Sequence, residues 1–161
     1  MDEKMLPAGF EQIWARVTDV SDTQETPLTP VQELERFMDG EAGSIAAYRA
    51  LAASCRGRDR QTVFRILSDE RRHMSLLQLE YFMRQGDSYL PAAPSAPPEG
   101  NVLTALREAF LAETGAAGAY GTAAERRGGE LGALYAAIGE DEARHARLLK
   151  EMAARCFTER A

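Results

Sequence analysis

The chain contains only two histidines, and each ends a Glu-x-x-His motif, at residues 70–73 and 142–145. On a helix, residues three apart project from adjacent turns of the same face, so one such pair can hold one metal ion. A further glutamate, Glu41 or Glu113, stands before each motif with 28 residues between them. The chain therefore offers two similar sets of one histidine and two glutamates, residue types that bind divalent metal ions.

The two sets belong to an internal repeat, because an offset of 72 residues superimposes the halves of the chain without a gap. The offset places Asp69–His73 on Asp141–His145 and Tyr48 on Tyr120. Glu is 17 of 161 residues, so glutamates at both offsets from two unrelated histidines would arise by chance in roughly one of ten thousand cases. The pattern therefore favours a shared function over incidental surface charge.

Four ionised glutamates that face one cavity would repel each other, whereas two divalent cations would cancel their charge. Oxygen-rich ligation with one imidazole per ion suits two iron ions, with manganese as a possible substitute, better than zinc, which prefers tetrahedral sites. We therefore expect a two-metal centre in which Glu70 and Glu142 bridge the ions. The expected terminal ligands are Glu41 with His73 and Glu113 with His145, and the sequence leaves open which of them share an ion.

Four further residues near the motifs have two interpretations each. Tyr48 and Tyr120 could donate hydrogen bonds to the ligand carboxylates, or could be core tyrosines with satisfied hydroxyls. Asp69 and Asp141 could accept hydrogen bonds from the second ring nitrogen of a histidine on another helix, or could be surface charges. We expect apolar residues to wall the cavity: Phe37, Ile45, Ile66, Phe110 and Ile138.

Four helical patterns position these residues. The expected helices cover residues 30–56, residues 60–85, a stretch from a cap at Asn101 as far as Gly128-Gly129, and a stretch through Leu131 towards Phe157. Thr29 and Gln32 can form a capping box for the first helix, and Asp59 can cap the second. The first helix is expected to stop at Gly57.

No segment alternates between polar and apolar residues like a strand, and residues 87–100, which contain four prolines, read as a linker. The first and second helices and the third and fourth are joined by short loops, and a long crossover joins the two pairs. This order predicts an all-α, ferritin-like four-helix bundle of two duplicated hairpins over residues 29–161. Residues 1–28 form an N-terminal extension. Its apolar positions predict a short amphipathic helix that either covers the core or docks a partner: Phe10, Ile13, Trp14, Val17 and Val20.

Composition excludes other classes of protein. The formal charge of −6 argues against nucleic acid as a partner. No window reaches eighteen uncharged apolar residues and no signal-peptide run follows Met1, so we expect a cytoplasmic protein that makes no membrane contact. Cys55 and Cys156 form no CxxC pair and fall outside the duplicated positions. We interpret them as core thiols, with a redox role as the alternative.

The paired Glu-x-x-His motifs with their upstream glutamates resemble the rubrerythrin branch of the ferritin-like superfamily, over about residues 30–157. The small size, the internal duplication and a glutamate-to-tyrosine spacing of seven in both halves favour that branch over bacterioferritin. The resemblance implies a non-haem di-iron oxidoreductase that reacts with peroxide or dioxygen in oxidative-stress defence, typically as a homodimer.

Two features depart from the usual pattern of that family. Rubrerythrins usually carry a further glutamate one turn after the third-helix ligand, where this chain has Ala116. The remaining six ligands are equally similar to those of bacterioferritin, manganese catalase and demethoxyubiquinone hydroxylase. We expect no rubredoxin domain after the bundle, and therefore an external electron donor such as a rubredoxin-like protein. The alternative function is iron handling, as a ferroxidase or a metal-binding protein without peroxidase turnover.

Overall fold

The computed structural model describes residues 27–92, 94 and 100–158. They form four α-helices: α2 (Pro30–Ser54), α3 (Gly57–Gln85), α4 (Val102–Arg127) and α5 (Gly129–Thr158). No strand occurs within these ranges. The all-α prediction is therefore confirmed for the described residues, whereas the apolar face predicted between Phe10 and Val20 lies outside them.

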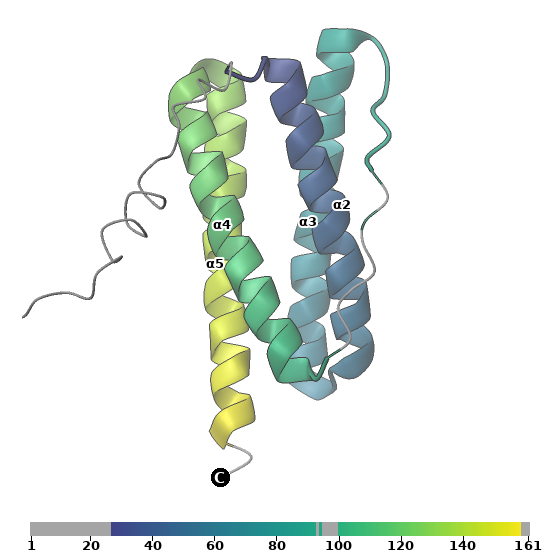
Figure 1. The fold of residues 1–161 in the computed structure, drawn as a ribbon, viewed down its shortest axis with the longest axis vertical. Helices are drawn as coiled ribbons and strands as arrows, with labels where there is room; N and C mark the ends of the chain where they lie inside the picture. The colour runs from purple at the N-terminus through teal and green to yellow at the C-terminus, as the bar shows by residue number, and fades with distance from the viewer. Residues whose placement is uncertain (1–26, 93, 95–99, 159–161) are drawn as a thin grey trace, which may run out of the picture.

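The helices pair into two hairpins that pack side by side as a bundle. One hairpin is α2 with α3 and the other is α4 with α5, each joined by a short loop (Figure 1). At the top of Figure 1 α3 ends, and at the bottom α4 begins, so their connection crosses the length of the bundle. The predicted arrangement of two hairpins and one long crossover is confirmed.

The helix ends follow local capping chemistry. At the start of α2, the Thr29 hydroxyl accepts a hydrogen bond from the backbone N–H of Gln32, whose side chain accepts one from the N–H of Thr29. Asn101 caps α4 by accepting from the N–H of Thr104. Gly86 ends α3 in the left-handed region at φ 71°, a conformation that costs glycine little. These three boundaries confirm the sequence predictions.

The loop between α2 and α3 differs from its prediction. The first helix ends at Ser54 rather than at residue 56, because Cys55 is extended. Gly57, with φ at 52°, is the first residue of α3 and not the stop of α2. Asp59 lies inside the first turn of α3 and does not cap it; its carboxylate instead accepts a hydrogen bond from Arg155 of α5 at 2.5 Å. The pairing with a distant arginine could not be read from local sequence.

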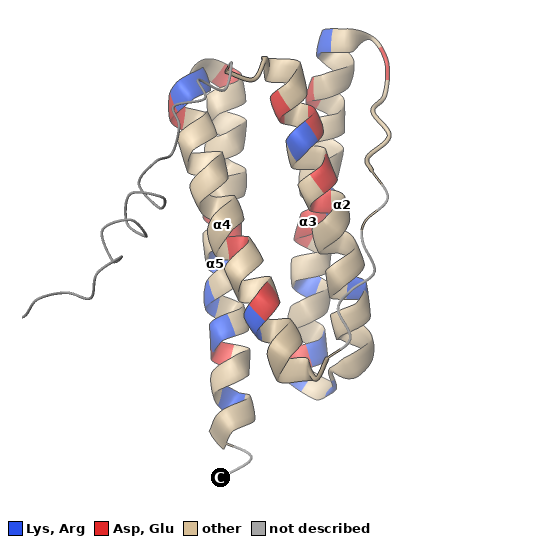
Figure 2. Ribbon diagram, viewed as in Figure 1, with Lys and Arg blue, Asp and Glu red and all other residues tan. Residues whose placement is uncertain are grey.

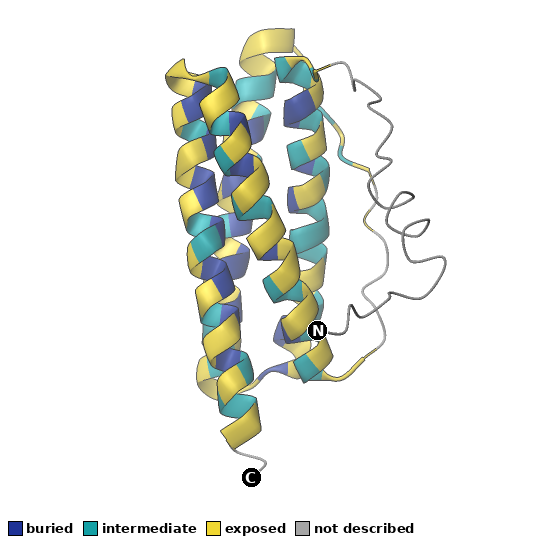
Figure 3. Cartoon of the chain, turned by 60° about the vertical axis from the view of Figure 1, so that its left-hand side comes forward, coloured by how far each residue is buried: buried dark blue, intermediate teal, exposed yellow. Residues whose placement is uncertain are grey.

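Two apolar clusters fill the bundle on either side of its middle. One contains Tyr48, Ile66 and Leu106, with Ile45 and Phe110 packed against it. The other cluster contains Leu34, Met38, Tyr120, Tyr135 and Ile138, with Phe37 packed against it. Figure 3 shows buried residues along the inward side of each helix. The five predicted wall residues thus divide between two clusters rather than forming a single wall.

Glycines bring α5 close to α4. A Cβ at Gly132 would lie 2.7 Å from the carbonyl oxygen of Ala124, and one at Gly139 would lie 3.2 Å from the Cβ of Tyr120. Backbone atoms cannot move aside as a flexible side chain can, so Gly132 has to lack a side chain. The residues 72 positions earlier are Arg60 and Leu67, so the first hairpin does not share these two glycines.

None of the described helices is both long and apolar enough to cross a bilayer.

Candidate metal centre

Six side chains meet in the middle of the bundle as two overlapping groups of possible metal ligands. Glu41, Glu70, His73 and Glu142 each offer one atom within 4.8 Å of the others. The second group, defined by the same distance, contains Glu70, Glu113, Glu142 and His145. All six residues are buried. The structure groups Glu41 with His73 and Glu113 with His145, while Glu70 and Glu142 belong to both groups.

Both histidines turn the same ring nitrogen towards this cluster. The Nδ1 of His73 lies 3.1 Å from a carboxylate oxygen of Glu142 and 3.7 Å from one of Glu41. The Nδ1 of His145 lies 3.0 Å from an oxygen of Glu70 and 3.5 Å from one of Glu113. In a two-metal centre, the carboxylates nearest to each histidine would therefore be the terminal glutamate of the same ion and a glutamate that bridges the two ions.

The other ring nitrogen of each histidine contacts an aspartate of the opposite hairpin. The Nε2 of His73 lies 3.1 Å from Asp141, and the Nε2 of His145 lies 3.2 Å from Asp69. A carboxylate at this nitrogen holds the proton there and leaves Nδ1 free to bind a metal ion. Of the two interpretations of these aspartates, the structure shows the contact with histidine.

Two arginines hold these aspartates in place, a role that the sequence analysis missed. Arg72 donates to Asp141 at 2.6 Å, and Arg144 donates to Asp69 at 2.9 Å. Arg144 also pairs with Asp141 on its own helix, at 2.6 Å. The contacts with Arg144 and the imidazole outweigh the effect of burial and lower the pKa of Asp141. A signal was present, because the offset of 72 places Arg72 on Arg144.

The two tyrosines also link the hairpins. The Tyr48 hydroxyl of α2 donates a hydrogen bond to Glu113 of α4, and the Tyr120 hydroxyl of α4 donates one to Glu41 of α2. Burial, reinforced by the negative charge of these glutamates, raises the pKa of both phenols, so they stay protonated donors. Each tyrosine is thus both a core residue and a partner of a candidate ligand.

Several inward-facing atoms of the cluster have no hydrogen-bond partner among the described residues. They are one oxygen each of Glu41, Glu70 and Glu113, and the Nδ1 of His73. An unsatisfied buried polar group costs about 1–3 kcal/mol. Four such atoms at one point, all of types that ligate divalent cations, fit a bound metal pair, which would satisfy them together.

Protons take the place of cations while no metal is bound. Burial raises the pKa of Glu70 to about 9 and that of Glu113 to about 7. Burial alone would lower the pKa of the histidines, but the nearby carboxylates outweigh it and raise the values to about 10 for His73 and about 12 for His145. The contacts with both imidazoles outweigh burial at Glu142 and hold its pKa well below the usual range. The buried carboxylates are therefore stabilised by positive charge, either from protons or from bound cations.

The cysteines lie away from this centre. Both are free, Cys55 is buried within the apolar cluster around Tyr48, and Cys156 packs against the same cluster. Burial raises the pKa of the Cys55 thiol, which disfavours the reactive thiolate. The structure thus supports the interpretation of Cys55 as a core thiol.

Comparisons of the chain with models of protein families, with curated proteins and with solved structures find no match, so the candidate centre rests on its own geometry.

Proposed function

We propose that the chain is a non-haem di-iron oxidoreductase that reacts with peroxide or dioxygen, with manganese as the alternative metal. One observation carries the proposal: two buried groups of ligand atoms overlap at Glu70 and Glu142. A single ion would need only one of these groups. Two overlapping groups of carboxylate and imidazole suit a pair of iron or manganese ions bridged by carboxylates.

The side chains have distinct tasks in this proposal. Glu41 and His73 would hold one ion, Glu113 and His145 the other, and the two shared glutamates would bridge them. When bound, the ions would supply the redox chemistry that no side chain of the cluster can supply. The protein contributes coordination geometry and flanks the ligands with two apolar clusters.

The neighbours of the ligands fix their positions. Asp141 and Asp69 keep the proton of each imidazole on Nε2, so that Nδ1 presents its lone pair to the ion. Tyr48 and Tyr120 each hold one oxygen of a terminal glutamate by hydrogen bonding, which leaves the other oxygen for the metal. Glu113 and Glu41 are both arranged in this way, since their second oxygens are the unpartnered ones.

Partners beyond the metal belong to the same proposal. The centre requires an external reductant between turnovers, and a rubredoxin-like electron-transfer protein is our proposed donor. A homodimer is proposed on the resemblance to rubrerythrins alone.

Metal content and a peroxide titration test the function. Elemental analysis of protein purified without added metal should find two irons per chain, and peroxide added to the reduced, ferrous protein should make ferric absorption appear. Glu142→Gln should lose the metal, while the matched control Glu140→Gln, an exposed residue on the same helix, should keep it. Two manganese ions per chain would redirect the proposal to catalase chemistry. A folded protein that binds no metal after reconstitution would contradict it.

Iron handling is the second candidate, favoured by the replacement of the seventh rubrerythrin ligand with Ala116. Ala116 packs against the apolar cluster around Tyr120 and offers no ligand atom. Uptake distinguishes the two functions. An enzyme stops at two ions and turns over peroxide, whereas a storage protein forms a large oligomer and takes up iron far beyond two ions per chain.

A further inference from the structure

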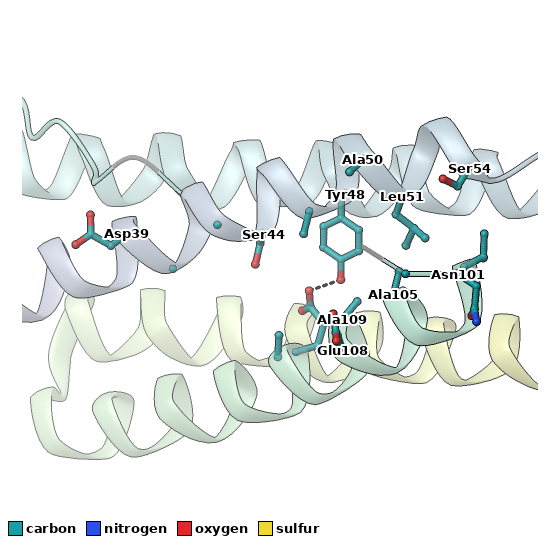
Figure 4. Close-up of a pocket in the computed structure, with 17 residues that line it drawn as sticks. Asp39, Ser44, Tyr48, Ala50, Leu51, Ser54, Asn101, Ala105, Glu108 and Ala109 are labelled. Carbon is teal, nitrogen blue, oxygen red and sulfur yellow. Dashed lines mark hydrogen bonds between the residues drawn. The ribbon is translucent and has the colours of Figure 1, made fainter. Parts of the chain in front are cut away.

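A groove of about 450 Å³ lies between α2 and α4 beside the candidate centre (Figure 4). Small residues line both of its sides: Gly40, Gly43 and Ala47 from α2, and Ala105, Ala109 and Ala112 from α4. Its volume is within the range of cavities that bind drug-sized organic molecules and far exceeds what peroxide or dioxygen requires. The groove therefore has room for a second, larger ligand.

The internal repeat shows that this space is not a necessary product of the bundle. The equivalent place in the other half of the molecule is filled. There, the ring of Phe37 stacks on that of Tyr120 with centroids 3.9 Å apart. Beyond this ring, the buried Glu33 pairs with Arg126 and Arg127 from the end of α4.

The groove is open because the counterparts of these filling residues are small. An offset of 72 residues places Phe37 on Ala109 and Glu33 on Ala105. In the other direction it places Arg126 on Ser54. All three small residues line the groove. One side of the duplicated bundle thus lacks the aromatic ring and the ion pair of the other, while the candidate metal-ligand positions are the same on both sides.

The groove reaches the candidate centre at its floor. Tyr48 and Glu113 both line it, and the dashed line in Figure 4 marks the hydrogen bond that Tyr48 donates to Glu113. Glu113 is 2% exposed, and one of its carboxylate oxygens has no partner among the described residues. A molecule in the groove would therefore lie against a candidate metal ligand and the phenol that orients it.

The charges around the groove restrict the chemistry of the ligand. Asp39 and Glu108 stand among its lining residues, and no lysine or arginine of the described part of the chain does. Acidic residues recur along α2 and α4 where the two helices face the viewer in Figure 2. An anionic ligand would be repelled, whereas a neutral molecule could bury its apolar part against the alanines and glycines.

We propose that this groove binds a neutral, mainly apolar organic molecule, with its inner end at the Tyr48–Glu113 pair. The identification of that molecule as a substrate of the di-metal centre rests on the proposed function. Binding itself does not, because the groove is formed by protein atoms alone.

Fluorescence of the neutral dye N-phenyl-1-naphthylamine tests binding in the metal-free, full-length chain. The dye should bind the wild-type protein, and 1-decanol should displace it at lower concentration than decanoate does. In Ala109→Phe the new ring should stack on Tyr48 as Phe37 stacks on Tyr120, and dye affinity should fall at least about tenfold, which corresponds to about 1.4 kcal/mol. The matched control Ala136→Phe adds the same ring at an exposed position of α5 and should leave binding unchanged.

One further variant and the metal content of the first separate the outcomes. Ala105→Leu narrows the groove by a smaller change and should also weaken dye binding, which covers the case that Ala109→Phe fails to fold. Metal content of Ala109→Phe should equal that of wild type, so loss of dye binding with metal retained supports the groove independently of the centre. Equal dye binding by wild type and both groove variants would overturn the proposal. Dimers that form only when the groove is unfilled would assign it to a second copy of the chain instead.

Discussion

Tyr48 and Tyr120 occupy equivalent positions in the two halves of the molecule, yet their surroundings differ. Each donates a hydrogen bond to a glutamate of the other hairpin. The Tyr120 side is filled, because Phe37 and Tyr135 pack their rings at 3.9 and 5.9 Å from its centroid. On the Tyr48 side the counterparts are Ala109 and Val63, and a groove remains. The hydrogen-bonded centre is symmetric, whereas its apolar surroundings are not.

This difference shows which positions the chemistry restricts. Glutamates, histidines, tyrosines and aspartates around the centre have identical counterparts, because each of them contacts another member of the set. Residues that only fill space can change in volume, provided that the loss of packing is tolerated. A duplicated scaffold can thus keep one cluster of candidate ligands and leave a groove beside it on a single side.

The largest expected effect is the loss of metal ions, which should be greater for a variant of a shared ligand than for a variant of a ligand on one side. Glu142→Gln should abolish binding of both ions, because an amide has only one oxygen and no charge with which to bridge them. Glu113→Gln should weaken mainly the ion on the groove side. Elemental analysis after dialysis against a defined excess of manganese measures both, with Glu140→Gln as the control. Retention of two ions by Glu142→Gln would contradict the bridging role.

The pH should affect metal binding on both sides of the centre. A metal ion binds neutral imidazole and must displace its proton, so affinity rises about tenfold per pH unit for each proton displaced, until the pH reaches the pKa. The pKa is about 10 for His73 and about 12 for His145, so both are protonated at neutral pH without metal. Binding of each ion should therefore become tighter as the pH rises through the neutral range.

Calorimetric titration with Mn²⁺ in buffers of different ionisation enthalpy measures the protons released. The two imidazolium protons, that of Glu70 with a pKa of about 9 and about half a proton from Glu113 with a pKa of about 7 predict the release of about three to four protons per chain at neutral pH. The affinity of both steps should rise between about pH 6 and pH 8. Affinity that does not change with pH would show that the histidines are not ligands.

Removal of the Phe37 ring should make the Tyr120 side of the bundle resemble the Tyr48 side. Phe37→Ala should lower the free energy of unfolding by about 2–4 kcal/mol, since the ring packs against Tyr120 and Tyr135. It should also create a second site for N-phenyl-1-naphthylamine. Denaturant titration and dye stoichiometry measure these effects.

Phe64→Ala is the matched control for this change, because its ring on α3 is 47% exposed. The control should alter stability by less than about 1 kcal/mol and leave one dye site. A Phe37→Ala protein with a single dye site and full stability would mean that the ring does not close the Tyr120 side.

The sequence predicted the polar centre better than the space around it. Histidine is rare in this chain, so the repeated glutamate spacing identified the six candidate ligands before the structure showed them together. The pairing of Glu41 with His73 depends on how two hairpins pack, and no spacing within one hairpin contains it. The groove also depends on packing, although the signal was present in the replacement of Phe37 by Ala109 between the repeats.

The other differences between prediction and structure concern helix boundaries and contacts between residues distant in sequence. Asp59 resembled a helix cap because aspartate before an apolar run often is one, but its partner is Arg155, almost a hundred residues later in the chain. The sequence assigned Arg72 and Arg144 no role, because their partners across the bundle, Asp141 and Asp69, are distant in sequence. Local rules predict local contacts, and these contacts are between hairpins.

The smallest expected effect concerns the backbone of the second hairpin. Gly132→Ala should destabilise the protein by about 1–3 kcal/mol, because its Cβ would lie 2.7 Å from the carbonyl oxygen of Ala124 and would push α5 away from α4. Gly118→Ala is the matched control, with no atom within 4 Å of its Cβ, and should be neutral or stabilising by up to about 1 kcal/mol, since alanine favours the helix. Denaturant midpoints compare the two. Equal midpoints would mean that α4 and α5 can separate without cost, and that the fit of this hairpin does not depend on Gly132.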